Sequence, residues 1–246
     1  MVLLPVVAVS QDDFSHRPDL DPQDARSGFE FLQPETQALQ LDEFANPGWL
    51  WVEAGRRQFE SGCVSCHTEG ASELRGAAAR YPQVDAATGT LMNLERRVQS
   101  CQVDRGGADP LPDRSLLELS AYLTSLSAGQ QKDVDISGEA APFFARGRAY
   151  FFRRKGQLNL ACNQCHDDHY GGLLRGDRLS QGHPNAFPAY RLEWQEMGSL
   201  HRRFQDCDVG VRAQPHPLGS DAYVELELYL AWRARTLQIE APGVRR

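Results

Sequence analysis

The sequence of 246 residues is long enough for one large domain or for two of ordinary size. Its 26 Lys and Arg residues against 33 Asp and Glu residues give a net charge of −7, which disfavours nucleic acid as a partner. Hydrophobic residues make up 41% and charged residues 24%, which excludes a chain that is disordered throughout. The longest apolar run, Val2–Val9, is too short to cross a bilayer, so we expect no membrane span.

Residues 1–43 are predicted to form the remnant of an export signal and an N-terminal arm. Met1–Ser10 is apolar and ends in small residues, but it lacks the basic start of a complete secretory signal. It fits either a signal remnant or a short apolar segment packed on the body. Pro18, Pro22 and Pro34 favour an extended arm over a domain in the residues that follow.

The six cysteines fall into two triplets about one hundred residues apart: Cys63, Cys66 and Cys101, then Cys162, Cys165 and Cys207. The segment before the last cysteine of each triplet repeats as well. LERRVQSC at residues 94–101 aligns without a gap with LHRRFQDC at residues 200–207. Internal similarity of this length predicts two similar structural units.

Helical spacing of apolar residues follows each triplet. Ser115 and Glu118 form a possible capping box that opens a helix ending near Gly129, and Asp221 is predicted to cap a second helix. Pro142 suits the first turn of a third helix. No segment alternates with the period of a β-strand, so the sequence predicts an all-α, loop-rich fold.

Both triplets begin with the pattern C-x-x-C-H, formed by Cys63, Cys66 and His67 and by Cys162, Cys165 and His166. This pattern is the signature of covalent haem c attachment, in which the thiols bond to the macrocycle and the histidine binds iron. A zinc site shared by the four thiolates is the alternative, but it leaves both histidines unexplained. The sequence therefore predicts two covalently bound haem c groups, and this attachment favours an exported, periplasmic location.

The repeat and the motifs together predict two tandem cytochrome-c-like domains, each built around one haem. We place the first domain at residues 44–131, a polar linker at 132–141 and the second domain at 142–246.

Cys101 and Cys207 admit three interpretations: one disulfide, two buried thiols, or one thiolate ligand at each haem iron. Their equivalent positions in the repeat favour ligation. Met92 and Met197 are rival ligands, but they fall out of register with each other and are more typical of core residues. The arginines around the two cysteines fit either pairing with acidic groups or a positive site that holds Cys207 as a thiolate.

Several long segments of the chain resemble the SoxA family, the dihaem cytochrome c subunits of SoxAX thiosulfate-oxidising complexes. The resemblance runs from about Arg26 to the C-terminus. It is carried by five segments: PETQALQLDEFANP (34–47), QLNLACNQCHDD (157–168), YRLEWQ (190–195), CDVGVRA (207–213) and YVELELYLAWRAR (223–235).

This resemblance implies an L-cysteine S-thiosulfotransferase that joins thiosulfate to a cysteine of the carrier SoxYZ, with the monohaem cytochrome SoxX as its partner. It implies iron ligation by His67 with Cys101 and by His166 with Cys207. It also implies that the haem of the second domain is the active-site haem, with a persulfide on Cys207 and Arg203 beside it. An electron-transfer cytochrome with two haems and no sulfur chemistry of its own is the alternative.

Overall fold

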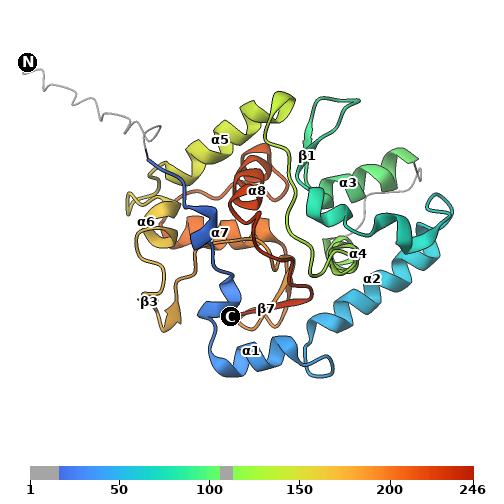
Figure 1. Ribbon diagram of the computed structural model, residues 1–246, viewed down its shortest axis with the longest axis horizontal. Helices are drawn as coiled ribbons and strands as arrows, with labels where there is room; N and C mark the ends of the chain where they lie inside the picture. Colours follow the sequence, from blue (N-terminus) through green and yellow to red (C-terminus); the bar gives the residue numbers. More distant parts are fainter. Residues whose placement is uncertain (1–16, 106–112) are drawn as a thin grey trace, which may run out of the picture.

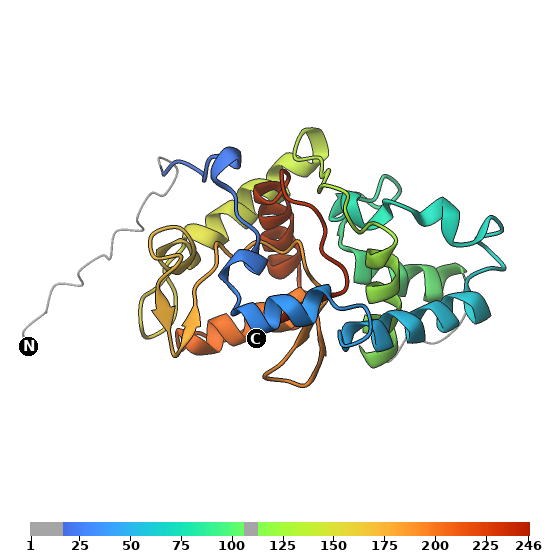
Figure 2. The same ribbon diagram turned by 60° about the horizontal axis from the view of Figure 1, so that its bottom comes forward.

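The structure, a computed structural model, describes residues 17–105 and 113–246, so the apolar segment 1–10 lies outside the described residues. Helices dominate it, and they gather in two groups that follow the sequence repeat (Figure 1). The group from residues 48–125 lies beside the group from residues 141–233, as a second view of the molecule shows (Figure 2).

The first group consists of α2 (Gly48–Gly62), α3 (Leu94–Ser100), a π-helical turn (Cys101–Arg105) and α4 (Asp113–Ser125). Helices α2 and α4 pack closely where Gly55 meets the backbone of α4. A Cβ atom at Gly55 would lie 2.0 Å from the carbonyl oxygen of Glu118, so this approach requires glycine. Helix α4 begins before the predicted capping box and ends at Ser125, ahead of Gly129.

The second group consists of α5 (Ala141–Phe152), α6 (Cys162–His166), α7 (Leu200–Gly210) and α8 (Asp221–Arg233). Helices α5 and α8 repeat the contact of α2 and α4: a Cβ atom at Gly147 would lie 1.9 Å from the carbonyl oxygen of Glu225. Pro142 occupies the first turn of α5 as predicted. Asp221 is the first helical residue of α8 and Ser220 takes the N-cap position, one residue earlier than predicted.

The chain is rich in helix, as expected, but short strands that the sequence analysis did not predict lie between the helices. Two hairpins pair β1 (Gln83–Val84) with β2 (Leu91–Met92) and β3 (Leu173–Leu174) with β4 (Asp177–Arg178). A small sheet has the order β6 (Glu196–Gly198), β5 (Ala189–Arg191), β7 (Gly243–Arg245), with Ala189 opposite Gly198 in the antiparallel pair and opposite Gly243 in the parallel one. Strands of two or three residues are too short to show a period of two in the sequence.

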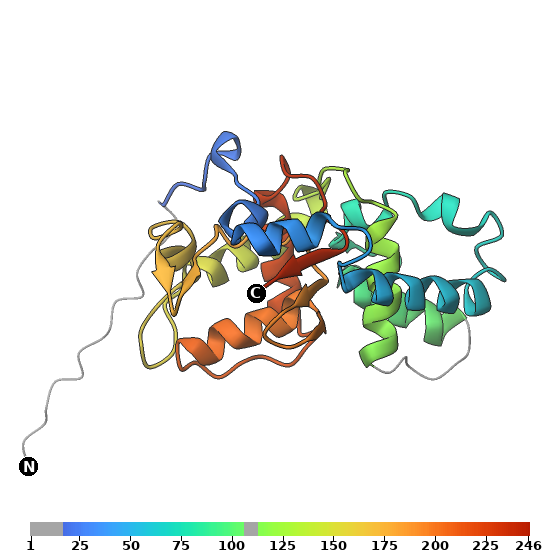
Figure 3. The same cartoon turned by 90° about the horizontal axis from the view of Figure 1, so that it is seen from below.

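The arm before α2 packs on the second group of helices instead of standing apart. It contains α1 (Pro34–Leu41), which the sequence analysis did not predict and which lies beside β7 when the molecule is seen from below (Figure 3). Gln40 Oε1 accepts a hydrogen bond from the backbone of Val244 at 2.9 Å. Asn46 Nδ2 donates to the carbonyl of Pro242 at 3.0 Å. The arm is thereby tied to the C-terminal strand.

Each group of helices has its own hydrophobic cluster. Trp51, Phe59 and Tyr122 belong to the first cluster, and Phe151, Tyr223 and Tyr229 belong to the second. Met197 is buried in the first cluster, which agrees with its expected place in the core. Across residues 17–105 and 113–246, no helix is long and apolar enough to span a membrane.

Candidate functional site

The second C-x-x-C-H motif forms the short helix α6 and turns His166 toward Cys207 of α7. His166 Nδ1 is hydrogen-bonded to the carbonyl oxygen of Ser180 at 2.7 Å. The side chain of Cys207 is hydrogen-bonded to His166 as well. Since Nδ1 is held by Ser180, the other ring nitrogen is the one directed to the sulfur. The structure thus brings His166 and Cys207, the two predicted iron ligands of the second half, within hydrogen-bond distance of each other.

The Cys207 thiol lies in a positive environment that favours its thiolate. Burial raises the pKa of this thiol, but Arg203, the hydrogen bond with His166 and Lys155 outweigh burial and lower the pKa to about 7. The pKa of Arg203 is in turn raised, chiefly by Cys207. The Arg203 side chain keeps 38% of its surface exposed, so it is partly open to solvent.

Sequence reasoning missed a buried polar cluster next to this cysteine. Asp208 directly follows Cys207 and is buried, and its carboxylate accepts hydrogen bonds from the hydroxyls of Tyr150 at 3.0 Å and Tyr223 at 2.7 Å. Lys155 forms an ion pair with the same carboxylate and lies 4.0 Å from the centre of the Tyr150 ring. An acidic residue next to the lone cysteine was the available signal, but the lysine comes from a distant loop.

The first motif has a different environment. His67 Nδ1 lies 2.5 Å from a carboxylate oxygen of Glu73, and its ring centre lies 5.9 Å from that of Phe59. Burial raises the pKa of Cys63, and Cys101 and Cys66 add to the effect, which puts Cys101 near the motif of its own half. Arg97, four residues before Cys101, forms an ion pair with Asp85.

Cys101 and Cys207 do not form a disulfide, because all six cysteines are free. The disulfide interpretation of the two lone cysteines is therefore wrong. Each lone cysteine interacts electrostatically with the C-x-x-C-H cysteines of its own half.

The surface around the second motif fits a covalently attached macrocycle. Apolar side chains that would ordinarily be buried stand exposed there: Leu158 at 47%, Leu173 at 67%, Leu174 at 53% and Val209 at 61%. A cavity of about 440 Å³ beside Cys165 is lined mainly by apolar residues, among them Leu160, Tyr170 and Leu179. Val64 and Val103 are likewise exposed within the first motif and just after Cys101. A haem would cover this apolar surface, so the residues present fit the group.

Comparison with known proteins agrees with the motifs. Residues 49–131 match the family model of the SoxA/TsdA cytochrome c domain. The chain is therefore a c-type cytochrome, a helix-rich protein that binds haem c covalently.

The chain is 37% identical over 229 residues to the L-cysteine S-thiosulfotransferase subunit SoxA of Pseudaminobacter salicylatoxidans, covering 89% of this chain and 80% of that protein. It is 35% identical to SoxA of Rhodovulum sulfidophilum, with the same coverage of 89% and 80%. The crystal structure of SoxXA from P. pantotrophus superposes with a TM-score of 0.86 at 35% identity, covering 90% of this chain and 87% of that one. The chain belongs to the SoxA family of L-cysteine S-thiosulfotransferase subunits.

Proposed function

We propose that this chain is the catalytic dihaem subunit that couples thiosulfate to a cysteine of the carrier SoxYZ and passes electrons to SoxX. The family membership, the SoxXA likeness and the environment of Cys207 support this proposal. We place two tandem cytochrome-c-like domains at residues 44–131 and 142–246, joined by the linker 132–141. We also propose a periplasmic location, since covalent haem attachment favours an exported protein.

The chain carries two sets of haem-binding residues. The first set is Cys63, Cys66, His67 and Cys101, and the second is Cys162, Cys165, His166 and Cys207. In each set the first two thiols would hold the macrocycle, and the histidine and the lone cysteine would bind the iron. A haem assay on the purified protein should find two haems per chain, and one haem per chain would contradict this assignment.

The reaction joins two sulfur atoms and releases two electrons. A carrier thiol and thiosulfate together lose one proton and two electrons and give a thiosulfonate on the carrier. The haem c groups, when bound, supply one-electron acceptors, one in this chain and one in SoxX. Cys207 would form the intermediate bond with the outer sulfur of thiosulfate, as a thiolate or a persulfide. The carrier thiolate would then attack that outer sulfur and release the sulfur of Cys207.

Arg203 is suited to bind the substrate anion at this cysteine. A guanidinium donates paired hydrogen bonds to oxyanions. Arg203 is close enough to Cys207 for the thiolate to raise its pKa, and its side chain is partly open to solvent. It would orient thiosulfate and stabilise negative charge on sulfur as the bond forms.

The observation that carries this function is the juxtaposition of His166, Cys207 and Arg203, so the test removes the thiol. We expect Cys207→Ala to keep its covalent haem, because the thioether cysteines are intact. Thiosulfate-dependent reduction of an acceptor cytochrome should fall at least about 10³-fold. Cys101→Ala is the matched control and should keep activity within about tenfold. Activity retained in Cys207→Ala would favour the alternative, an electron-transfer cytochrome without sulfur chemistry.

A further inference from the structure

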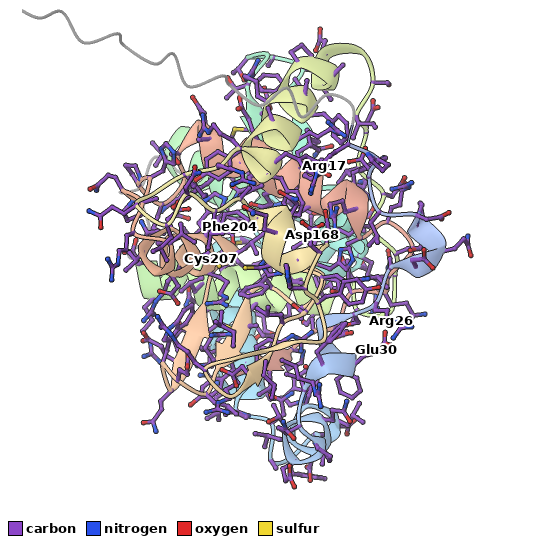
Figure 4. All side chains as sticks on the ribbon, turned by 90° about the vertical axis from the view of Figure 1, so that its left-hand side faces the viewer. Arg17, Arg26, Glu30, Asp168, Phe204 and Cys207 are labelled. Carbon is purple, nitrogen blue, oxygen red and sulfur yellow. The ribbon has the colours of Figure 1, made fainter. Side chains whose placement is uncertain are left out.

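The N-terminal arm crosses the second half of the molecule beside α6. In Figure 4, Arg17, Arg26 and Glu30 of the arm lie on the same side of the molecule as Asp168 and Cys207. Arg17 forms an ion pair with Asp168, two residues after His166, at 3.3 Å. The arm is thus in contact with the segment that carries the second motif.

Anchors on either side hold the arm in this place. Asp19 accepts hydrogen bonds from Arg148 Nε at 3.1 Å and from the Tyr229 hydroxyl at 2.6 Å. Thr236 Oγ1 donates to the carbonyl of Pro22 at 2.9 Å. Because these bonds come from α5, α8 and the chain after α8, the arm is fixed to the body of the second half at several points.

Gln181 joins the arm to the loop that faces His166. Its side chain is completely buried. Its Oε1 accepts a hydrogen bond from the backbone N–H of Arg26 at 2.7 Å, and its Nε2 donates to the carbonyl oxygen of Asp24 at 3.1 Å. Both arm partners are backbone groups, so Gln181 responds to the path of the arm and not to the side chains at 24 and 26.

The two neighbours of Gln181 hold the His166 ring. Ser180 offers the carbonyl oxygen that binds Nδ1 at 2.7 Å. Gly182, with a φ of +73°, lies against the ring face, where a Cβ atom would come within 2.9 Å of Cγ of His166. A shift of residue 181 would therefore alter both the hydrogen bond at the ring edge and the contact on the ring face.

We propose that Gln181 is a positioning residue for His166 and that the N-terminal arm, through the backbone at Asp24 and Arg26, sets the orientation of this ligand. The inference rests on the proposed function, in which His166 binds iron. The partner of the second ring nitrogen fixes the orientation and basicity of a ligating histidine, and its loss commonly costs 10–100-fold in activity or affinity. His67 has no counterpart of this arrangement, because Glu73 on its own loop supplies the partner.

The test removes one donor of the arm without touching the haem site. Arg26→Pro deletes the N–H that binds Gln181, and Ala25 already has the extended conformation, with ψ of 127°, that a following proline requires. Arg26→Ala is the matched control, since it removes the side chain and keeps the N–H. The readouts on haem-loaded protein are the ferric low-spin EPR spectrum and the midpoint potential of each haem.

We expect Arg26→Pro to change the EPR signal and the potential of the second haem only and to lower kcat about tenfold. Arg26→Ala should match the unmodified chain. Gln181→Met keeps the buried volume but loses both hydrogen bonds to the arm, together with the contact of Gln181 Oε1 with His183 Nε2 at 3.2 Å. It should reproduce Arg26→Pro and serves if the proline variant does not fold. Variants at 26 and 181 that leave the second haem unchanged would overturn the inference.

His166→Met, measured alongside, separates this inference from the function on which it rests. If the second-haem signal changes in His166→Met but not in Arg26→Pro or Gln181→Met, the ligand assignment stands and the role of the arm is refuted. If the signal is unchanged even in His166→Met, His166 is not a ligand and both proposals fail.

Discussion

The two halves of the molecule share a helix order and a motif, but the arginine four residues before the lone cysteine is used differently in each. In the first half Arg97 is paired with Asp85, and both side chains are largely covered. In the second half Arg203 lies 3.8 Å from Asp206, a loose pair, and its strongest interaction is with Cys207. The same repeat position is therefore engaged in an ion pair in one half, and in the other it is the position that we propose for anion binding.

The histidines differ in a related way. His67 is held by a carboxylate on its own loop, whereas His166 is held by a backbone carbonyl whose loop is tied to the N-terminal arm. The carbonyl oxygen of Ser180 can hold His166 only if the loop that carries it keeps its position. The orientation of His166 therefore depends on long-range packing of the arm, whereas His67 is paired with a residue close to it in sequence.

The largest expected effect is a difference in kcat/KM between substitutions of Arg203 and of Arg97. We predict that Arg203→Ala lowers kcat/KM for thiosulfate about 10²–10³-fold, the usual cost of removing one group that stabilises developing negative charge. Arg97→Ala should change kcat/KM less than about threefold, because Arg97 is engaged with Asp85. Steady-state kinetics with an acceptor cytochrome measures both. Equal losses in the two variants would remove the functional distinction between the halves.

The next effect tests the structural likeness of the halves. Gly55→Ala and Gly147→Ala each place a methyl group on a backbone carbonyl, at 2.0 and 1.9 Å, so the packed helices must move apart. We predict that each lowers the free energy of unfolding by about 3 kcal/mol, as overpacking a rigid contact does. Gly62→Ala at the end of α2 meets no atom within 4 Å and should be neutral or slightly stabilising. Denaturant unfolding of the haem-loaded proteins decides between these outcomes.

A third effect concerns Glu95 and His201, which occupy equivalent positions of the two repeats and meet at the junction of the halves. Glu227 lies 3.0 Å from His201 and interacts electrostatically with Glu95, as does Lys132, which lies between α4 and α5. Burial raises the pKa of Glu95 to about 7, with a further contribution from Glu227. Since the folded chain then holds a proton that the unfolded chain has released, stability falls as the pH rises from about 4.5 to 7.

Glu95→Gln replaces the ionisable carboxyl group with a neutral amide, so it should remove this contribution to the pH dependence of stability. Compared with the unmodified chain, we expect the variant to gain on the order of 2 kcal/mol between pH 5 and pH 8, seen as several degrees in Tm. Thermal unfolding at the two pH values measures the gain. Glu35→Gln, at an exposed position of α1, is the control. A stability difference that is the same at both pH values would contradict the assignment.

The sequence located the candidate site residues of both halves but predicted little of their surroundings. The repeat located both motifs and paired each lone cysteine with its own motif, because equivalent spacing survives folding. Lys155, Ser180 and Gln181 were not predicted as parts of the second site, since they reach it only through contacts made by distant segments. Helix α1 and the short strands were missed for another reason: tertiary contacts stabilise them, and their own sequences carry little periodicity.

The smallest expected effect tests whether the first haem takes part in the oxidation of thiosulfate. Glu73→Gln replaces the charged acceptor at His67 Nδ1 with a neutral one, which makes the ring a weaker donor to iron. The midpoint potential of the first haem should shift to a more positive value, while kcat for thiosulfate stays within about twofold. Redox titration followed by absorbance, together with steady-state turnover, measures both quantities on the same preparation. A fall in turnover that accompanies the shift in potential would place the first haem on the route of the electrons, and the two halves would then share one function instead of dividing it.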